Sequence, residues 1–129
     1  MSSPVDVAGV SVSTEHFIGG ERVPSAETFT DLSPIDEQPL AEVARGGQRE
    51  ADLAVAAATG AAPEWAALGP AGRAEVLHRL ADLIDANVEP LAAVECVDMA
   101  MLLRSLKARL INRCARNFRS YADLAVAYE

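Results

Sequence analysis

The chain has 129 residues, half of them hydrophobic and 23% charged, with a net charge of −8. This length fits one ordinary domain, and the composition excludes collagen-like, disulfide-scaffold and disordered proteins. Aromatic residues make up only 5% of the chain, whereas Ala occurs 25 times. A core poor in rings and rich in Ala predicts closely packed helices, because Ala leads the helix-propensity scale and lets backbones approach.

Charge and apolar pattern limit the classes of partner. A net charge of −8 argues against a general nucleic-acid binder, which needs a broad basic surface. No run of about 18 apolar residues is present, and residues 1–14 lack the basic and apolar regions of a secretion signal. Cys96 and Cys114 form no spacing pattern and are expected to be buried, unpaired thiols. The sequence therefore predicts a soluble cytoplasmic protein that binds neither nucleic acid nor membrane.

Short strands are predicted in the first third of the chain. Residues 1–13 have no periodicity and are expected to form a flexible tail. Residues 16–18 and 22–23 flank Gly19-Gly20-Glu21, and a Gly pair supplies the positive φ that tight hairpins require. A second strand pair is predicted at 28–32 and 40–44, joined by a turn with proline at both ends.

After Gly46-Gly47 the pattern changes to helix. The first helix is predicted from Gln48 to about Ala62, with acidic residues in its first turn and Pro63 ending or kinking it. Gly69-Pro70 opens a second helix, and Asn87 is expected to cap a third. The predicted fold class is therefore α+β and mainly helical, with short antiparallel strands followed by about four helices.

The last helix, from Leu103 to about Ala127, has the strongest amphipathic pattern. Its large apolar residues share one arc: Leu103, Leu106, Leu110, Ile111, Cys114, Phe118, Tyr121 and Leu124. Five arginines share the opposite arc: Arg104, Arg109, Arg113, Arg116 and Arg119. This basic arc would suit an anionic partner or a membrane surface, or it is simply the solvent-facing side of the helix.

No catalytic or metal centre is predicted. His78 has no carboxylate or Cys at ligand spacing, and a Cys96–His78 dyad is less favoured than a buried thiol and a surface imidazole. No phosphate-binding glycine motif is present, and Gly46-Gly47 before a helix is only a weak anion-site pattern. No strand is predicted after Ala44 to build a dinucleotide-binding sheet. Asp82 with Asp85, and Asp36 with Glu37, are interpreted as residues of solvated faces and turns.

The order of several segments resembles the front part of the aldehyde dehydrogenase superfamily. The first hairpin is similar to the family's Y-I-N-G-E-W-V, and later segments are similar to its I-A-E-V-A strand, its D-x-A-V-x-A-A…W helix, its R-A-x-x-L-x-x-x-A-D-x-I helix and its L-A-x-x-E-x-x-D segment. The matching segments are HFIGGERV (16–23), FTDLSP (29–34), LAEVA (40–44), 53–65 with Trp65, RAEVLHRLADLI (73–84) and LAAVECVD (91–98). The resemblance covers about 110 residues without a gap.

The resemblance implies the N-terminal part of an NAD(P)-dependent aldehyde dehydrogenase, truncated before the catalytic domain, over residues 14–129. The family oxidises an aldehyde to a carboxylic acid through a thiohemiacetal. Its P-W-N, E-L-G-G-K and G-Q-x-C motifs do not occur here, and neither Cys96 nor Cys114 matches the nucleophile's context. No catalytic, cofactor-binding or metal-binding residue is therefore assigned, and this chain alone is expected to bind neither NAD nor NADP.

One segment departs from the family pattern. Where many members read D-T-G-K-P, this chain has Asp98-Met99-Ala100-Met101-Leu102, and Ala100 in place of Gly favours continuation of the helix. Some members bind a monovalent cation near this Asp, but that site is not carried over to Asp98 and Asp31.

Three roles remain open. The first is an inactive piece of the enzyme that associates with itself or with the missing C-terminal portion. The alternative is a stand-alone helical module that uses the amphipathic last helix for interaction or oligomerisation. The third is an independent small binder that uses the basic arc of that helix.

Overall fold

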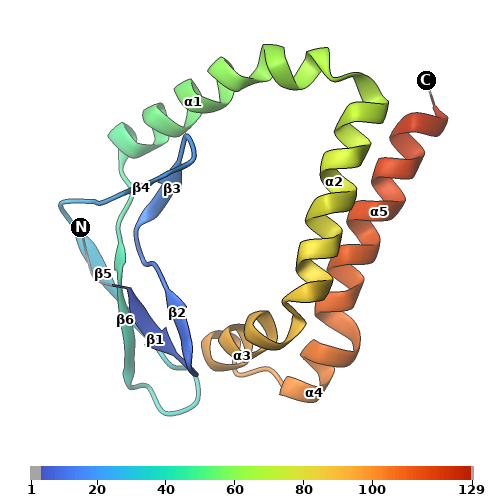
Figure 1. Cartoon of the computed structure of the whole chain (residues 1–129). Helices are drawn as coiled ribbons and strands as arrows, with labels where there is room; N and C mark the ends of the chain where they lie inside the picture. Colours follow the sequence, from blue (N-terminus) through green and yellow to red (C-terminus); the bar gives the residue numbers. More distant parts are fainter. Residues whose placement is uncertain (1–3, 129) are drawn as a thin grey trace. The chain divides into compact units, whose positions relative to one another are not determined.

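The computed structural model describes residues 4–128, which fall into two compact units. Unit 1 contains the described residues up to Pro63 together with Val97–Ala100, and unit 2 contains Glu64–Cys96 and the described chain from Met101. Unit 1 holds the strands, most of the first helix and the end of the third, and unit 2 holds the rest of the helices (Figure 1). The predicted class, mainly helical with short antiparallel strands first, is confirmed.

Unit 1 begins with a hairpin that the sequence did not predict. β1 (Val5–Val7) pairs antiparallel with β2 (Val10–Val12) around Ala8 and Gly9, both of which have positive φ. Valines occupy both ends of each strand, so apolar residues alternate with polar ones, as in a half-exposed strand. The expectation of a tail without structure is therefore wrong for residues 5–12, while residues 1–3 lie outside the described residues.

The two predicted strand pairs are confirmed. β3 (His16–Ile18) pairs with β4 (Glu21–Val23), and Gly19 and Gly20 between them have φ values of 63° and 87°. β5 (Thr28–Leu32) pairs with β6 (Pro39–Ala44) with an irregular register after Asp31. Each pair forms a separate two-stranded sheet, and no strand follows β6 in residues 45–128.

The first helix is longer than predicted. α1 extends over Gln48–Ala67 and includes Pro63, so the predicted end near Ala62 is wrong, while the alternative that Pro63 kinks the helix stays a prediction. A proline within a helix removes one backbone hydrogen bond and crowds the preceding turn, but the Ala-rich sequence on both sides keeps the helical conformation. The boundary between the two units nevertheless falls at Pro63.

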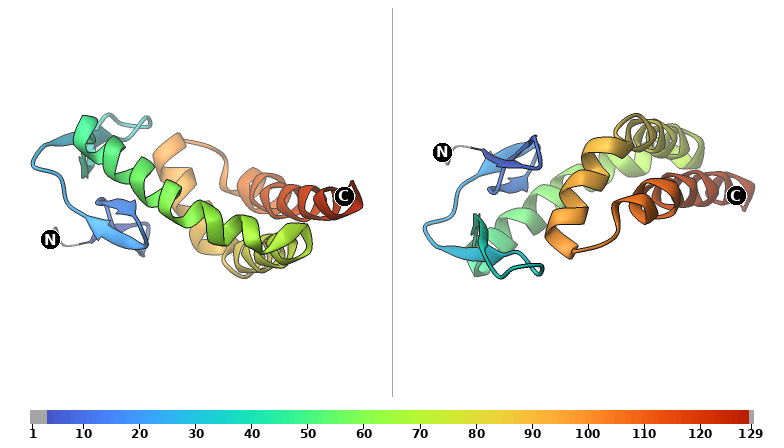
Figure 2. Two further views of the ribbon diagram at one scale, coloured as in Figure 1. Left: turned by 90° about the horizontal axis from the view of Figure 1, so that it is seen from above. Right: turned by 90° about the horizontal axis from the view of Figure 1, so that it is seen from below.

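Unit 2 is built on two antiparallel helices, α2 (Gly69–Ala86) and α5 (Ile111–Ala127), which lie side by side (Figures 1 and 2). The predicted start of α2 at Gly69-Pro70 is confirmed. Small residues form the contact: Ala74 and Ala81 on α2, and Ala115 and Ala122 on α5, are all buried. Both pairs are seven residues apart, so one stripe of each helix faces the other, and the missing side-chain bulk lets the backbones approach.

The segment before α5 is not a uniform α-helix. α4 (Leu103–Ser105) continues into a single π-helical stretch, η1 (Leu106–Leu110), and then into α5. Asn112 donates from Nδ2 to the carbonyl oxygen of Lys107 (3.0 Å), a group in the irregular stretch. The same stretch carries Leu106, which is 1% exposed and is the only large side chain in residues 4–128 that is fully buried.

α3 (Val88–Met99) connects the two helices, and both of its predicted ends need correction. Asn87 donates from Nδ2 to the carbonyl oxygen of Leu83 (2.8 Å), so its side chain contacts the end of α2 rather than the start of α3. Ala100 has a φ of 52°, and α3 ends at the preceding residue. The expectation that Ala100 would extend the helix is therefore wrong: the chain turns here in the left-handed conformation that suits glycine.

Replacing Ala100 by glycine is expected to stabilise the chain by about 0.5–1 kcal/mol. A left-handed non-Gly residue costs about 1–2 kcal/mol, and the greater freedom of glycine in the unfolded chain cancels only part of that gain. Urea unfolding followed by circular dichroism measures the change. As a control, Ala61→Gly within α1 should lower stability by about 1 kcal/mol. A loss of stability in Ala100→Gly would contradict the strained conformation.

Two further observations complete the fold. No helix within residues 4–128 combines the length and apolar character needed to cross a membrane. Cys96 is half-buried but Cys114 is exposed on α5, so the expectation of two buried thiols is wrong for Cys114.

Candidate functional site

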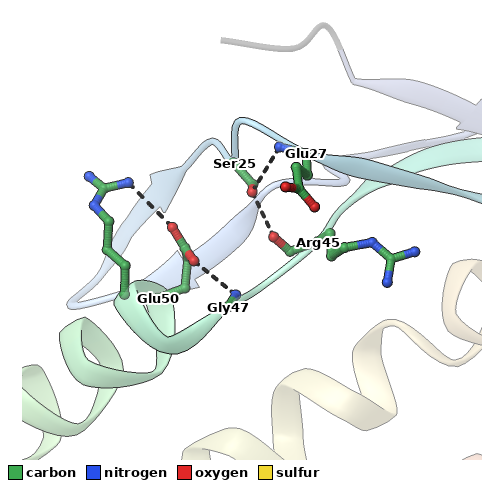
Figure 3. A network of polar contacts seen from close by, with 6 residues as sticks. Ser25, Glu27, Arg45, Gly47 and Glu50 are labelled. Carbon is green, nitrogen blue, oxygen red and sulfur yellow. Dashed lines mark hydrogen bonds and ion pairs between the residues drawn. The ribbon is translucent and has the colours of Figure 1, made fainter.

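One cavity of unit 1 lies where β6 leads into α1, and Figure 3 shows the polar contacts of residues that line it. The Ser25 hydroxyl donates to the carbonyl oxygen of Arg45 (2.6 Å) and accepts the backbone N–H of Glu27 (3.3 Å). The bond to Arg45 ties the segment before β5 to the segment after β6, on either side of the β5–β6 hairpin. The cavity, of about 390 Å³, is lined by these residues and by residues 46–50.

In this region the N-terminus of α1 is bonded to a carboxylate of the chain itself, that of Glu50. The Glu50 carboxylate accepts the backbone N–H of Gly47 through Oε2 (2.9 Å) and pairs with Arg49 through Oε1 (3.3 Å). The hydrogen bond from Gly47 is the main reason why the pKa of Glu50 is lowered. The chain's own carboxylate thus occupies the position in which Gly46-Gly47 would cradle a phosphate, so the weak anion-site pattern is not a free site.

His16 lies on the other side of the glycine pair. A second cavity, of about 370 Å³, is lined by His16, Gly46, Gly47 and Glu50 among others. A side chain on Gly46 would place its Cβ 3.2 Å from Cε1 of His16, a tight contact that the imidazole could relieve only by shifting slightly. His16 Nε2 is buried and has no hydrogen-bond partner in residues 4–128. No hydroxyl or thiol lines this cavity, so it offers no nucleophile for the imidazole to activate.

Two carboxyl groups of unit 1 interact directly. The pKa of Asp31 is raised, first by burial and then by the nearby charge of Asp98 and a side-chain hydrogen bond with it. Sharing a hydrogen bond requires a proton on one of the two groups, because ionised carboxylates only accept. The resemblance to the family had associated Asp31 and Asp98 only as possible ligands of a monovalent cation. The described residues contain no group of three or more His, Cys, Asp or Glu placed to hold a metal ion.

Replacing Asp31 by Asn is expected to raise stability at neutral pH. A carboxyl whose folded pKa is raised stabilises the fold only below its unfolded pKa of roughly 4, and that contribution is lost as the pH rises through the folded pKa. Asn keeps a donor toward Asp98 without a charge, so the advantage of Asp31→Asn should shrink as the pH falls toward roughly 4. Urea midpoints measured across this range test the expectation.

Asp36→Asn is the matched control with the opposite sign. The pKa of Asp36 is lowered by hydrogen bonds from Ser33 and from the backbone of Gln38, so its contribution is present at neutral pH and is lost as the pH falls. Asp36→Asn should therefore destabilise the chain at neutral pH. Equal effects of the two substitutions at neutral pH would contradict the assignment of the Asp31–Asp98 contact.

Three ion pairs among the described residues of unit 2 join α2 to α5. Arg119 donates to Asp82 (2.6 Å) and Asp85 (2.8 Å), and these bonds raise the pKa of the guanidinium group. Asp123 pairs with Nε2 of His78 (2.9 Å). Asp82 and Asp85 are exposed, as expected for a solvated face, but they also pair with Arg119. The prediction of an outward basic arc is wrong for Arg119, which lies toward α2. The i, i+3 spacing of Asp82 and Asp85 places both carboxylates on one face of α2, and this spacing was the sequence signal for a shared partner.

The remaining sequence candidates do not assemble into a catalytic arrangement. His78 contacts Asp123 rather than Cys96, and neither thiol forms a hydrogen bond or disulfide within residues 4–128. Fold and site together thus describe a scaffold of hairpins and helices, with no nucleophile–base pair in the described residues.

This scaffold belongs to a known family. The model of the aldehyde dehydrogenase family matches residues 22–129, so the chain is a member of that family. It is 39% identical over 109 residues to 5-carboxymethyl-2-hydroxymuconate semialdehyde dehydrogenase of Escherichia coli, a match that covers 84% of this chain and 23% of the relative. The chain thus spans about a quarter of the length of the relatives it matches, corresponding to their N-terminal part.

Solved structures agree with the sequence match. HpcC from Thermus thermophilus has a TM-score of 0.82 and 38% identity, and the alignment covers 91% of this chain and 25% of that one. An indole-3-acetaldehyde dehydrogenase from P. syringae, solved with NAD⁺ and IAA, has a TM-score of 0.87 and 30% identity over 94% of this chain and 25% of its own. The predicted family is confirmed.

The described residues do not fit the pyrophosphate of NAD at the one place where the sequence suggested it. The Glu50 carboxylate bonded to Gly47 would repel a phosphate there. No parallel strands follow β6 within the described chain to form the edge at which such folds bind dinucleotides.

Proposed function

We propose that this chain supplies the N-terminal part of an NAD(P)-dependent aldehyde dehydrogenase of the cytoplasm and does not catalyse the reaction by itself. The observation that carries the proposal is the family match over residues 22–129, which spans only about a quarter of the relatives' length. The P-W-N, E-L-G-G-K and G-Q-x-C motifs are absent from these 129 residues. The nucleophilic thiol, the base and the cofactor site would therefore come from the part of the enzyme that these residues do not include.

The contribution of this chain is structural. The hairpins and the segment around Ser25 hold the start of α1, and the Ala-rich contact of α2 with α5 keeps two helices together. Neither region offers a group that bonds to an aldehyde carbon or accepts a hydride. The residues that hold NAD or NADP and the reacting aldehyde would lie on the complementary part.

The test is complementation. The purified chain, mixed with an aldehyde and NAD or NADP, should produce no change in absorbance from the reduced cofactor, and calorimetric titration with NAD should give no saturable heat. The complementary three quarters of a relative such as the Escherichia coli enzyme, expressed without its N-terminal part, should be inactive alone and gain activity when this chain is added. The Leu106→Ala variant serves as a folding-defective control.

Turnover by the purified chain alone would overturn the proposal. If such turnover were lost in Cys96→Ser but kept in Cys114→Ser, Cys96 would be the nucleophile. Saturable NAD binding in the micromolar range would indicate a cofactor site that the Glu50–Gly47 contact does not predict.

A second candidate function is a stand-alone interaction module. The observation that favours it is the exposed apolar surface of α5, on which Tyr121 is 69% exposed and Leu124 is 47% exposed. Exposed apolar residues next to charged ones are typical of interaction surfaces. Failure of complementation, together with a sharp cooperative melt of the isolated chain, would favour this candidate.

A further inference from the structure

We propose that the outward face of α5 binds the acidic unit 1 of a second copy of this chain. The outward face is defined by seven exposed residues of η1 and α5: Arg109, Leu110, Arg113, Cys114, Arg116, Tyr121 and Leu124. The proposal concerns self-association only and does not depend on the aldehyde dehydrogenase reaction.

The direction of this face follows from what covers the rest of α5. Ala115 and Ala122 are fully buried, and Arg119 and Asp123 form ion pairs with α2. At 100° per residue, Arg113 and Leu124 lie opposite Ala115 and Ala122. Arg116 lies roughly a quarter turn from the two alanines on one side, Cys114 and Tyr121 lie roughly a quarter turn from them on the other, and all of these residues are exposed. α2 therefore covers one side of α5 and leaves the other side exposed.

The outward face carries positive charge that is not compensated within the described chain. Arg113 and Arg116 form no ion pair in residues 4–128, and neither does Arg109 one turn earlier. Three guanidinium groups thus border an apolar strip formed by Leu110, Cys114, Tyr121 and Leu124. Such a surface suits a partner that combines acidic groups with apolar area.

Unit 1 has the complementary charge. Its segments, residues 1–63 and 97–100, contain eleven Asp and Glu residues but only three Lys and Arg residues. Those three arginines have local contacts: Arg22 lies over the Phe17 ring, Arg45 over the Phe29 ring, and Arg49 pairs with Glu50. Exposed apolar residues are also present in unit 1, including Phe17 and Ile35. A second copy therefore supplies both features that the outward face requires.

The positive charge of the outward face also determines which surfaces of the two copies meet. Two outward faces packed against each other would oppose arginines, so the favoured contact joins α5 of one copy to unit 1 of the other. Two such contacts close a symmetric dimer. A 17-residue helix is about 25 Å long and about 10 Å wide, so two reciprocal contacts bury on the order of 1,000 Å². That area lies at the lower limit for specific association, which predicts a weak dimer that dissociates in salt.

The mass of the full chain in solution tests the proposal. Analytical ultracentrifugation over a range of protein concentrations should detect dimers at low ionic strength and monomers at roughly 1 M NaCl, where the screening length falls to about 3 Å. The double variant Arg113→Glu/Arg116→Glu should raise the dissociation constant at least about tenfold at low salt. Its circular dichroism spectrum should match the wild type, because both side chains lie away from α2.

The matched control makes the same change of charge elsewhere. Arg79→Glu/Arg104→Glu alters two exposed arginines of unit 2 that lie outside the outward face, and it should leave the dimer in place. The native thiols give a local readout: alkylation of Cys114 should slow as the dimer forms, while alkylation of Cys96 serves as the internal reference. In Arg113→Glu/Arg116→Glu, the rate at Cys114 should no longer depend on protein concentration.

Three results would overturn the proposal. The first is a monomer at every salt concentration with Cys114 freely alkylated. The second is a dimer that neither salt nor the double variant weakens, which would place the contact on another surface. The third is a monomer in which Cys114 is protected at every concentration, which would mean that the chain's own residues cover the face.

Discussion

Replacing Leu106 by Ala is expected to lower the free energy of unfolding of unit 2 by about 2–5 kcal/mol. Leu106 is 1% exposed, and the other buried apolar residues in the described part of unit 2 are all alanines. Removing the isobutyl group loses its burial and leaves a cavity that an irregular π-helical backbone cannot close without further distortion. For a domain of this size such a loss removes a large part of the total stability.

Thermal unfolding followed by circular dichroism at the helix band measures this effect. Leu102→Ala is the matched control, because Leu102 is 62% exposed and lies only four residues earlier. Its substitution should change the free energy of unfolding by less than about 0.5 kcal/mol. A loss of equal size in the two variants would mean that Leu106 is not the central packing residue of unit 2.

Local signals of the sequence were sufficient for most element boundaries. Gly19-Gly20 predicts a hairpin because both residues need positive φ, and Gly69-Pro70 predicts a helix start because proline lacks the donor that the first turn leaves unused. Boundaries failed where tertiary context prevailed over propensity. Pro63 lies inside α1, and Ala100 adopts a conformation that glycine would adopt at less cost.

The contacts of α5 could not be predicted from its pattern of large apolar residues. The arc of large apolar side chains would mark the buried side of α5 only if the largest side chains always faced the neighbouring helix. In the structure, the small residues Ala115 and Ala122 are the fully buried residues of α5. Tyr121, within the predicted apolar arc, is mostly exposed, whereas Arg119, within the predicted basic arc, faces α2. A one-helix projection contains no information on which partner helix lies nearby.

The candidate site was predicted only in part. The acidic first turn of α1 correctly indicated that a carboxylate would meet the helix N-terminus, and Glu50 does so. The close approach of His16 to Gly46 and the contact between Asp31 and Asp98 join residues 30 and 67 positions apart. Such contacts depend on how the chain returns on itself, which single-sequence patterns do not specify.

Enlarging the contact between α2 and α5 is expected to separate the two helices. In Ala122→Leu, a side chain with three more carbon atoms must enter a position that is now 0% exposed and faces other small residues. Overpacking of this kind costs about 1–3 kcal/mol when neighbours can shift, and here the shift also lengthens the bonds of Arg119 to Asp82 and Asp85. The melting temperature should therefore fall by several degrees, roughly 4–8 °C for each kcal/mol lost.

Ala125→Leu is the control, because the same change at an exposed position of the same helix should leave the melting temperature nearly unchanged. If Ala122→Leu melted like Ala125→Leu, close approach through alanine would not be what holds α2 against α5, and the ion pairs of Arg119 and His78 would have to account for the contact.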